Sequence, residues 1–206
     1  MAAPVRVKVC GITNRDDALA AVDAGAFALG LNFYPHSPRY IHPQEAGGIV
    51  KSLPRRVWAV GVFVNEVWER VAGIAADVGL TALQFHGDES PAYCSEWPGK
   101  TVIKALRVRD RHGAAVAATY SVDFILADAY VEGRFGGTGT RVAADFLEGF
   151  DRSRLILAGG LTPDNVAAVV RAVRPFAVDV ASGIESAPGK KDWTLMKRFI
   201  ANARAA

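Results

Sequence analysis

The chain is poor in cysteine and has no long hydrophobic run. Its 206 residues include only Cys10 and Cys94, which form no Cys-x-x-Cys pair, so a disulfide framework is excluded and a reducing compartment is indicated. The most continuous apolar run, near Val57 to Val64, is far too short to span a bilayer, and the first residues lack the apolar core of a signal peptide. We therefore expect a cytoplasmic protein with no membrane partner.

An excess of one charge is also lacking. Twenty-four Lys and Arg face 21 Asp and Glu, a net charge of +3, and the basic pairs Arg55-Arg56 and Lys190-Lys191 are isolated. Without a long basic run or interleaved aromatic residues, the pattern argues against nucleic-acid binding. The basic pI of about 9.0 instead suits a surface or site for a small anion.

Metal and nucleotide signatures are missing as well. The four histidines, His36, His42, His86 and His112, show no metal-ligand spacing, so we predict no metal site. We expect His86 to line a pocket and the other three to lie at the surface. The glycine-rich loop 132–140 lacks the Gly-Lys-Ser/Thr ending of a nucleotide-binding loop, which argues against ATP binding.

What the sequence does contain is an eightfold alternation of short apolar runs and helical segments. The predicted strands are 5–10, 26–33, 57–64, 80–85, 101–106, 123–127, 155–158 and 176–180. The predicted helices are 14–24, 43–52, 66–78, a short one from Ser90, 110–119, 143–148, 163–173 and 192–203.

Repeated strand-helix units with short connections imply parallel strands joined by right-handed crossovers. Eight such units in this length predict an α/β protein with a single-domain (β/α)8 TIM barrel spanning residues 1–206. An open doubly wound sheet is the alternative, but no Gly-x-Gly-x-x-Gly turn follows the first strand.

In such a barrel the C-terminal ends of all strands form one face, where reactive residues converge. Cys10 ends the first predicted strand and Asp128 follows the sixth, which makes them candidates for acid-base catalysis. A thiol is a base only as thiolate, and Lys8, two residues earlier on the same strand, is a possible source of the positive charge required. We therefore expect Lys8 to line the pocket with Cys10. For each residue considered alone there is a structural alternative: Cys10 as a core cysteine and Asp128 as a capping aspartate.

Two small-residue turns follow the last two predicted strands. Gly159-Gly160 precedes a helix begun by proline, and Ser182-Gly183 follows the eighth strand. Backbone N–H groups at such turns approach anions closely, and phosphate binding after the last two barrel strands is usual. We favour a phosphate site over plain tight turns because two such turns occur in adjacent units.

Two other loops carry candidate residues. Arg39 lies in Ser-Pro-Arg-Tyr, where a planar guanidinium is suited to a carboxylate, although a solvated loop arginine is as reasonable. Gly137 lies in the glycine-rich loop 132–140, which we interpret as a pocket-lining flap or a further part of the anion site, with a plain flexible loop as the alternative.

The motifs together resemble the phosphoribosylanthranilate isomerase family. The resemblance runs from about Val5 to the C-terminus in the family's order. It rests on these segments: Lys8-Val9-Cys10-Gly11-Ile12-Thr13, Phe33 to Tyr40, Val60 to Asn65, Leu83 to Gly87, Gly136 to Gly139, Ala158 to Leu161, Asp179 to Glu185 and Pro188 to Asp192. Loop 132–140 departs from the family after Gly139, where Val142-Ala143-Ala144 replaces a Phe-Asp-Trp-like segment.

The resemblance implies a cofactor-free Amadori rearrangement of a small phosphoribosyl substrate in tryptophan biosynthesis, by a monomer or homodimer. It implies Asp128 as the acid for the ribose ring oxygen and Cys10 as the base for the C2 proton. It further implies Arg39 on the anthranilate carboxylate and the two small-residue turns on the phosphate. The alternatives are a related phosphoribosyl barrel isomerase, which Cys10 in place of aspartate argues against, and a non-catalytic phosphosugar-binding barrel.

Overall fold

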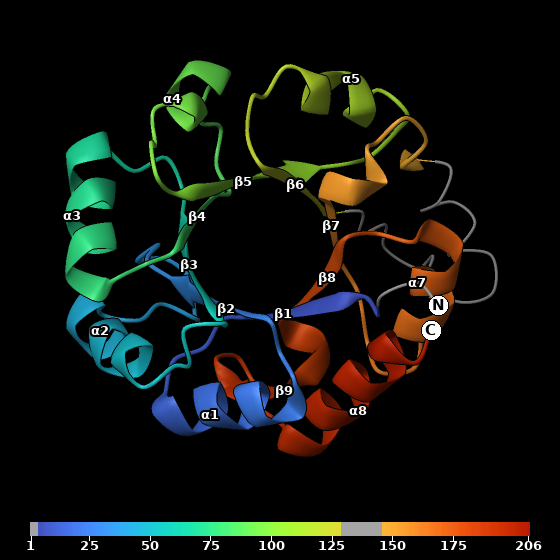
Figure 1. Ribbon diagram of the computed structural model, residues 1–206, viewed down its shortest axis with the longest axis horizontal. Coiled ribbons are helices and arrows are strands. Elements are labelled where there is room, and N and C mark those ends of the chain that lie inside the picture. Colours follow the sequence, from blue (N-terminus) through green and yellow to red (C-terminus); the bar gives the residue numbers. More distant parts are fainter. Residues whose placement is uncertain (1–3, 129–145) are drawn as a thin grey trace.

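Eight parallel strands close into a barrel surrounded by helices (Figure 1). The computed structural model describes residues 4–128 and 146–206. In it, the predicted (β/α)8 architecture is confirmed, with neighbouring strands paired in the order β1 to β8 and β8 returning to β1. Residues 143–145 of the predicted helix 143–148 lie outside the described residues.

The barrel strands are β1 (Arg6–Cys10), β2 (Ala28–Asn32), β3 (Trp58–Phe63), β4 (Ala82–Phe85), β5 (Thr101–Arg107), β6 (Phe124–Asp128), β7 (Leu155–Ala158) and β8 (Ala177–Val180). The helices are α1 (Arg15–Ala24), α2 (Pro43–Lys51), α3 (Trp68–Val78), α4 (Pro91–Ser95), α5 (Gly113–Ala118), α7 (Val166–Val173) and α8 (Trp193–Arg204). Short 3-10 turns, η1 (Arg152–Arg154) and η2 (Ser182–Ile184), precede β7 and follow β8.

Small and branched apolar side chains fill the barrel interior. Alternate strand residues point inward, and those that pack together there are Ala28, Val60, Ala82, Ile103, Ala105, Leu126, Ile156, Ala158 and Ala177. Aromatic rings at or just before the strand starts pack beneath them, from Phe27, Trp58, Phe124 and Phe176. The interior is therefore filled by apolar side chains at its N-terminal end, where Arg6 lies over the Phe176 ring.

Helix starts follow the local chemistry of the sequence. Asn14 caps α1 by accepting a hydrogen bond from the backbone N–H of Asp17, and Asp192 caps α8 in the same manner. Helix α7 begins at Val166, three residues later than predicted, because Asn165 folds back on the preceding turn. Its side chain donates to the Gly160 carbonyl and accepts from the Thr162 N–H.

One element was not predicted. β9 (Glu185–Ala187) and β10 (Lys190–Lys191) form an antiparallel pair between β8 and α8. This pair carries Glu185 and Lys191 back to the C-terminal end of the barrel. Over the described part of the chain, no helix is both long and apolar enough to cross a membrane.

Candidate active site

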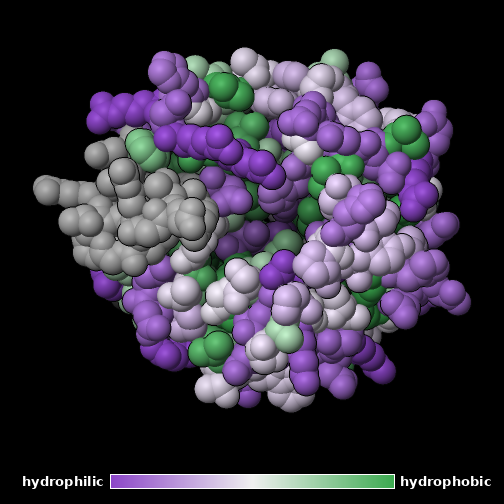
Figure 2. Space-filling view, turned by 180° about the vertical axis from the view of Figure 1, so that it is seen from behind, coloured by the Kyte–Doolittle hydropathy of each residue, from purple (hydrophilic) through white to green (hydrophobic). Residues whose placement is uncertain are grey.

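A cavity of about 540 Å³ opens at the C-terminal ends of the strands. Figure 2, which views the molecule from the side opposite to Figure 1, shows a central hollow bordered by hydrophilic residues. The lining residues come from seven of the strand ends or the loops after them: Cys10, Asn32, Ser37, Arg39, Val62, Gln84, His86, Asp128, Ala158 to Leu161 and Asp179 to Gly183. The cavity thus brings together residues 173 positions apart in the sequence, from Cys10 to Gly183.

Beneath Cys10 lies a buried ion pair. Lys8 is fully buried, and its Nζ is 2.7 Å from Oδ1 of Asp179 on the neighbouring strand β8. Burial by itself lowers the Lys8 pKa, but the attraction of Asp179 and its hydrogen bond outweigh that effect, so the pKa is raised and Lys8 is charged. Lys8 is fully buried and is not among the residues that line the cavity, but its amine is bound by Asp179, which does line it. That Lys8 is part of the pocket stays a prediction.

The thiol of Cys10 is mostly protonated at neutral pH. Burial raises its pKa above the ordinary value, and the lowering by the positive charges of Lys8 and Lys191 does not compensate, since Asp179 also raises it. The charge of Lys8 thus lowers the Cys10 pKa, as predicted, but not enough to populate the thiolate at neutral pH. Gly30, on β2, leaves the space for the thiol, because a Cβ there would lie 2.7 Å from Sγ of Cys10.

Arg39 holds a carboxylate, and that carboxylate belongs to Glu185. Nε of Arg39 is 2.9 Å from Oε1 of Glu185, and Nη2 is 2.6 Å from Oε2. Lys191 reaches the same carboxylate at 2.7 Å and donates to the Cys10 carbonyl at 2.6 Å. Burial would raise the Glu185 pKa, but the hydrogen bonds from both cations outweigh it and hold that pKa below its ordinary value.

The Arg39 loop is fixed by local polar contacts. The backbone N–H of Arg39 donates to Oγ of Ser37, and Nδ2 of Asn32 donates to the same oxygen. Gly11 provides room for the arginine: its φ is +76°, and a Cβ there would lie 2.5 Å from Cδ of Arg39. The glycine after the catalytic candidate therefore permits the approach of the guanidinium to the site.

The two predicted phosphate turns lie against each other. A Cβ on Gly183 would lie 1.9 Å from the Leu161 carbonyl oxygen, so the turn after β8 packs directly on the turn after β7. Gly159 and Gly160 both have positive φ, 95° and 60°. The N–H groups of Gly159, Gly160, Ser182 and Gly183 donate to no other described residue, and all four residues line the cavity.

His86 and Asp128 both line the cavity at this end of the barrel. Burial lowers the His86 pKa below its ordinary value, outweighing the nearby Asp128 and Asp179 carboxylates, which raise it. The imidazole is therefore neutral at pH 7. Its Nδ1 lies 3.1 Å from Nε2 of Gln84, the preceding inward-facing residue of β4.

A second buried ion pair holds the loop after β4. Lys104 Nζ is 2.7 Å from Oε2 of Glu89 and also donates to the carbonyls of Phe85 and Gly87. Glu89 accepts in turn from the N–H groups of Asn65 and Gly87. Fully hydrogen-bonded buried charges of this kind restrict backbone movement, so they fix the loop that carries His86.

Most sequence-predicted site residues line one cavity: Cys10, Arg39, His86, Asp128, Gly159, Gly160, Ser182 and Gly183. Gly137 lies outside the described residues. His36, His42 and His112 are exposed, as predicted, and Cys94 is buried. Four residues at or near the site were not predicted from the sequence: Gln84, Asp179, Glu185 and Lys191. For Gln84 a signal was available, because it lies two residues before His86 and so belongs to the same face of the strand.

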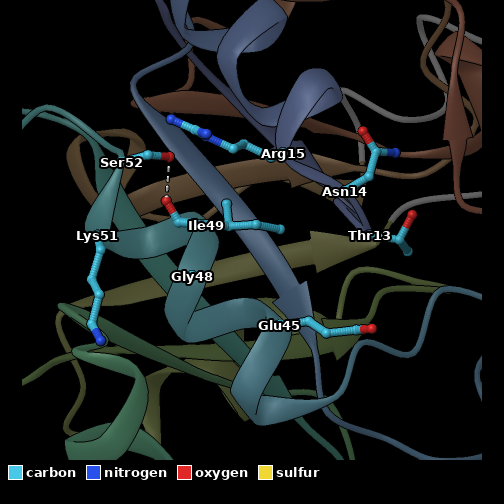
Figure 3. Close-up of a pocket in the computed structure, with 8 residues that line it drawn as sticks. All are labelled: Thr13, Asn14, Arg15, Glu45, Gly48, Ile49, Lys51 and Ser52. Carbon is cyan, nitrogen blue, oxygen red and sulfur yellow. Dashed lines mark hydrogen bonds between the residues drawn. The ribbon is translucent and has the colours of Figure 1, made fainter.

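A second cavity, of about 620 Å³, lies outside the barrel between α1 and α2 (Figure 3). It is lined by Thr13, Asn14, Arg15, Glu45, Gly48, Ile49, Lys51 and Ser52. It contains no cysteine or histidine and is separate from the strand ends, so we assign the chemistry to the barrel cavity. Among residues 4–128 and 146–206, no three His, Cys, Asp or Glu side chains are grouped to hold a metal ion.

The comparisons with known proteins agree with one another. Residues 7–202 match the family described as N-(5'-phosphoribosyl)anthranilate (PRA) isomerase. The N-(5'-phosphoribosyl)anthranilate isomerase of Trichlorobacter lovleyi is 49% identical over 204 residues, 98% of this chain and 99% of the relative. The crystal structure of phosphoribosyl anthranilate isomerase from Thermotoga maritima is 43% identical with a TM-score of 0.88, and covers 98% of this chain and 100% of its own.

A further solved structure carries a ligand. It is a phosphoribosyl anthranilate isomerase in complex with reduced 1-(o-carboxyphenylamino)-1-deoxyribulose 5-phosphate. It is 43% identical to this chain with a TM-score of 0.87, and it covers 98% of this chain and 100% of its own.

Proposed function

The chain belongs to the N-(5'-phosphoribosyl)anthranilate isomerase family, and on that premise we propose which of its residues perform the reaction. The enzyme isomerises N-(5-phosphoribosyl)anthranilate to 1-(2-carboxyphenylamino)-1-deoxyribulose 5-phosphate in tryptophan biosynthesis. The observation that supports the assignment of residues is the single cavity at the strand ends, where a thiol, a carboxylate, a guanidinium and two turns meet, and the N–H groups of these turns donate to no described residue.

Asp128 is the general acid. It protonates the ring oxygen of the ribose, the C1–O bond breaks, and the anthranilate nitrogen forms a Schiff base with C1. Cys10 is the general base: its thiolate removes the C2 proton and the electron pair moves into the C1–C2 bond, which gives an enolamine. Loss of the proton from the C2 hydroxyl and protonation at C1 then give the ketone product. A positioned acid and base contribute a factor of about 10²–10⁴ each to such proton transfers.

Because the Cys10 pKa is raised, the resting thiol must lose its proton before it can remove the C2 proton. Lys8 and Lys191 are the positive charges that favour the thiolate. Binding of the substrate displaces water from the cavity, which strengthens the interaction of the thiolate with these two cations.

The two anionic ends of the substrate have separate sites. The N–H groups at Gly159-Gly160 and Ser182-Gly183 bind the phosphate. Arg39 binds the anthranilate carboxylate. Glu185 uses Nε and Nη2 of Arg39, and no contact among the described residues uses Nη1, so part of the guanidinium remains for the substrate. Binding both ends fixes the reacting carbons between Cys10 and Asp128.

We also propose that residues 1–206 act as one domain, as a monomer or homodimer, in the cytoplasm. Both cysteines are free thiols, which suits a reducing compartment. Proton transfers between C1, C2 and the ring oxygen need no redox cofactor and no metal, so none is proposed. The partner is the small phosphoribosyl substrate, with no nucleic acid or membrane involved.

The test is direct conversion of freshly prepared N-(5-phosphoribosyl)anthranilate, followed by anthranilate fluorescence. We expect a loss of signal that depends on the amount of enzyme. No loss above the rate without enzyme would contradict the proposal.

A further inference from the structure

The β9–β10 hairpin brings two buried charged side chains against the end of β1. The side chains of Glu185 and Lys191 are 4% and 0% exposed. Neither residue is among those that line the cavity. Replacing a buried ion pair with well-packed apolar residues is often neutral or stabilising, so stability alone does not account for charged side chains here.

Glu185 fixes the direction of the Arg39 guanidinium. Its carboxylate accepts from Nε of Arg39 at 2.9 Å and from Nη2 at 2.6 Å, so one edge of the planar group is held. A guanidinium is rigid, and fixing one edge sets the direction of the other. Because Arg39 lines the cavity, Glu185 determines how the guanidinium is presented there.

Lys191 holds the carbonyl of the residue that carries the thiol. Its Nζ donates to the Cys10 carbonyl at 2.6 Å and to the Ala181 carbonyl, directly after β8, at 3.4 Å. The same ammonium lies 2.7 Å from Oε1 of Glu185. A single cation thus joins two strand ends to the carboxylate that holds Arg39.

The hairpin is itself fixed to the first strand-helix unit. The backbone N–H of Lys191 donates to Oδ2 of Asp17 at 3.0 Å, and the indole N–H of Trp193 donates to Oδ1 of Asp17 at 2.7 Å. The hydroxyl of Thr13 donates to the Gly189 carbonyl at 2.6 Å. Side chains carried by the hairpin therefore have a fixed position relative to β1.

We propose that Glu185 and Lys191 are positioning residues for the reaction, with separate effects. Glu185 orients Arg39 for the carboxylate of the substrate. Lys191 holds the backbone of Cys10 and places a positive charge near its thiol. The assignment rests on the proposed function, because it concerns the same acid-base site. Glu185 should then act mainly on KM and Lys191 mainly on kcat.

Four charged groups from four parts of the fold interact with the Cys10 thiol: Lys8 of β1, Asp179 of β8, Lys191 of β10 and Arg39 of the loop after β2. Lys8 and Lys191 lower the pKa of the thiol, and Asp179 raises it. Loss of the Lys191 charge should therefore raise this pKa further and reduce the thiolate population.

The experiment compares Glu185→Gln and Lys191→Met with matched controls at exposed residues, Glu69→Gln and Lys190→Met. Glutamine keeps the shape of Glu185 without its charge, and methionine does the same for Lys191. Anthranilate fluorescence gives kcat and KM. The rate of Cys10 alkylation by iodoacetamide at about pH 8 reports the thiolate population, with Cys10→Ser as background. Urea unfolding shows whether each variant is folded.

We expect Glu185→Gln to raise KM about 5- to 20-fold and to change kcat less than about threefold, because Arg39 loses its fixed direction. Lys191→Met should lower kcat about tenfold and keep KM within about threefold, since a shift of about one unit in the thiol pKa changes the thiolate population about tenfold. Alkylation should slow about tenfold in Lys191→Met and stay within about twofold of the wild type in Glu185→Gln. Both controls should match the wild type in every measurement.

An unchanged KM in Glu185→Gln would overturn the role of Glu185. Unchanged or faster alkylation in Lys191→Met would overturn the role of Lys191, because a loosened strand end exposes the thiol without lowering its thiolate population. Equal changes in kcat and KM in both variants would also overturn the proposal, since they would show a shared structural role.

If Lys191→Met does not fold, Glu185→Gln and Glu185→Asp decide the matter. Aspartate keeps the charge but is too short to hold both cations, so the proposal requires a rise in KM in both variants, and its absence overturns the proposal. Absence of turnover by the wild type would instead remove the proposed function. The alkylation rates do not depend on turnover, so they separate the two failures.

Discussion

The carboxylate of Glu185 binds one edge of the Arg39 guanidinium through Nε and Nη2, at 2.9 and 2.6 Å, although the residues are 146 positions apart. A paired arginine does not rotate freely, so its remaining N–H groups point in a fixed direction. Glu185 is itself held by Lys191, which also binds the Cys10 carbonyl. One chain of contacts therefore connects the carboxylate site to the end of β1.

Removal of the guanidinium should weaken substrate binding. Hydrogen bonds to a charged group contribute about 1.5–3 kcal/mol, so we expect Arg39→Ala to raise KM about 10- to 150-fold with a smaller change in kcat. Arg39→Lys should restore little, because an ammonium lacks the planar fork that Glu185 and the substrate share. Steady-state kinetics provide the measurement, and an unchanged KM in Arg39→Ala would exclude a carboxylate site here.

Gly11 should be intolerant of a side chain. Alanine at φ +76° is strained by about 1–3 kcal/mol, and its Cβ would push against Cδ of Arg39. We expect Gly11→Ala to lower the free energy of unfolding by that amount and to raise KM. Gly48→Ala is the control: a Cβ there meets nothing within 4 Å, so it should stabilise α2 by about 0.5–1 kcal/mol. Equal effects of both substitutions in urea unfolding would refute the steric argument.

Removal of one partner of the buried Lys8–Asp179 ion pair should destabilise the protein. Lys8→Met leaves the Asp179 carboxylate buried and unpaired, and we expect a loss of about 3–5 kcal/mol in the free energy of unfolding. The double variant Lys8→Met with Asp179→Leu should recover most of that loss. Lys190→Met, at an exposed lysine, should stay within about 0.5 kcal/mol of the wild type. A single variant as stable as the double one would contradict the pairing.

The thiol of Cys10 should titrate above the ordinary range. Burial favours the neutral thiol, so the thiolate fraction at neutral pH is low and rises as the pH passes the raised pKa. We expect the rate of alkylation by iodoacetamide in the free enzyme to keep rising beyond about pH 9. Burial also raises the pKa of Cys94 to about 11, so Cys10→Ser should abolish nearly all of the reaction below that pH. A plateau near pH 7 would show a preformed thiolate instead.

The sequence predicts the strands well because their signals are local. Apolar runs bounded by glycine or polar turns mark β1 to β8. Strand ends in a barrel share one face, so the strand pattern alone is enough to place Cys10 and Asp128 together. The limits of α7 are predicted less accurately, because the Asn165 turn competes with the helix start.

The contacts that hold the site are not predictable in the same way. Glu185 and Lys191 reach Arg39 and the end of β1 only through the β9–β10 hairpin, whose short strands carry no apolar pattern. Asp179 and Lys8 pair across 171 residues, and nothing local indicates that pairing. The raised Cys10 pKa depends on burial and on three charges from β1, β8 and β10, so it emerges only from the folded barrel.

The central assignment is Cys10 as base and Asp128 as acid, and its most direct test is turnover by Cys10→Ser and Asp128→Asn. Turnover is followed by anthranilate fluorescence. We expect each variant to lose a factor of about 10²–10⁴ in kcat while its circular dichroism spectrum stays unchanged. Asp164→Asn, at an exposed carboxylate in the segment between β7 and α7, should keep full activity. Wild-type turnover by either Cys10→Ser or Asp128→Asn would contradict the acid-base assignment.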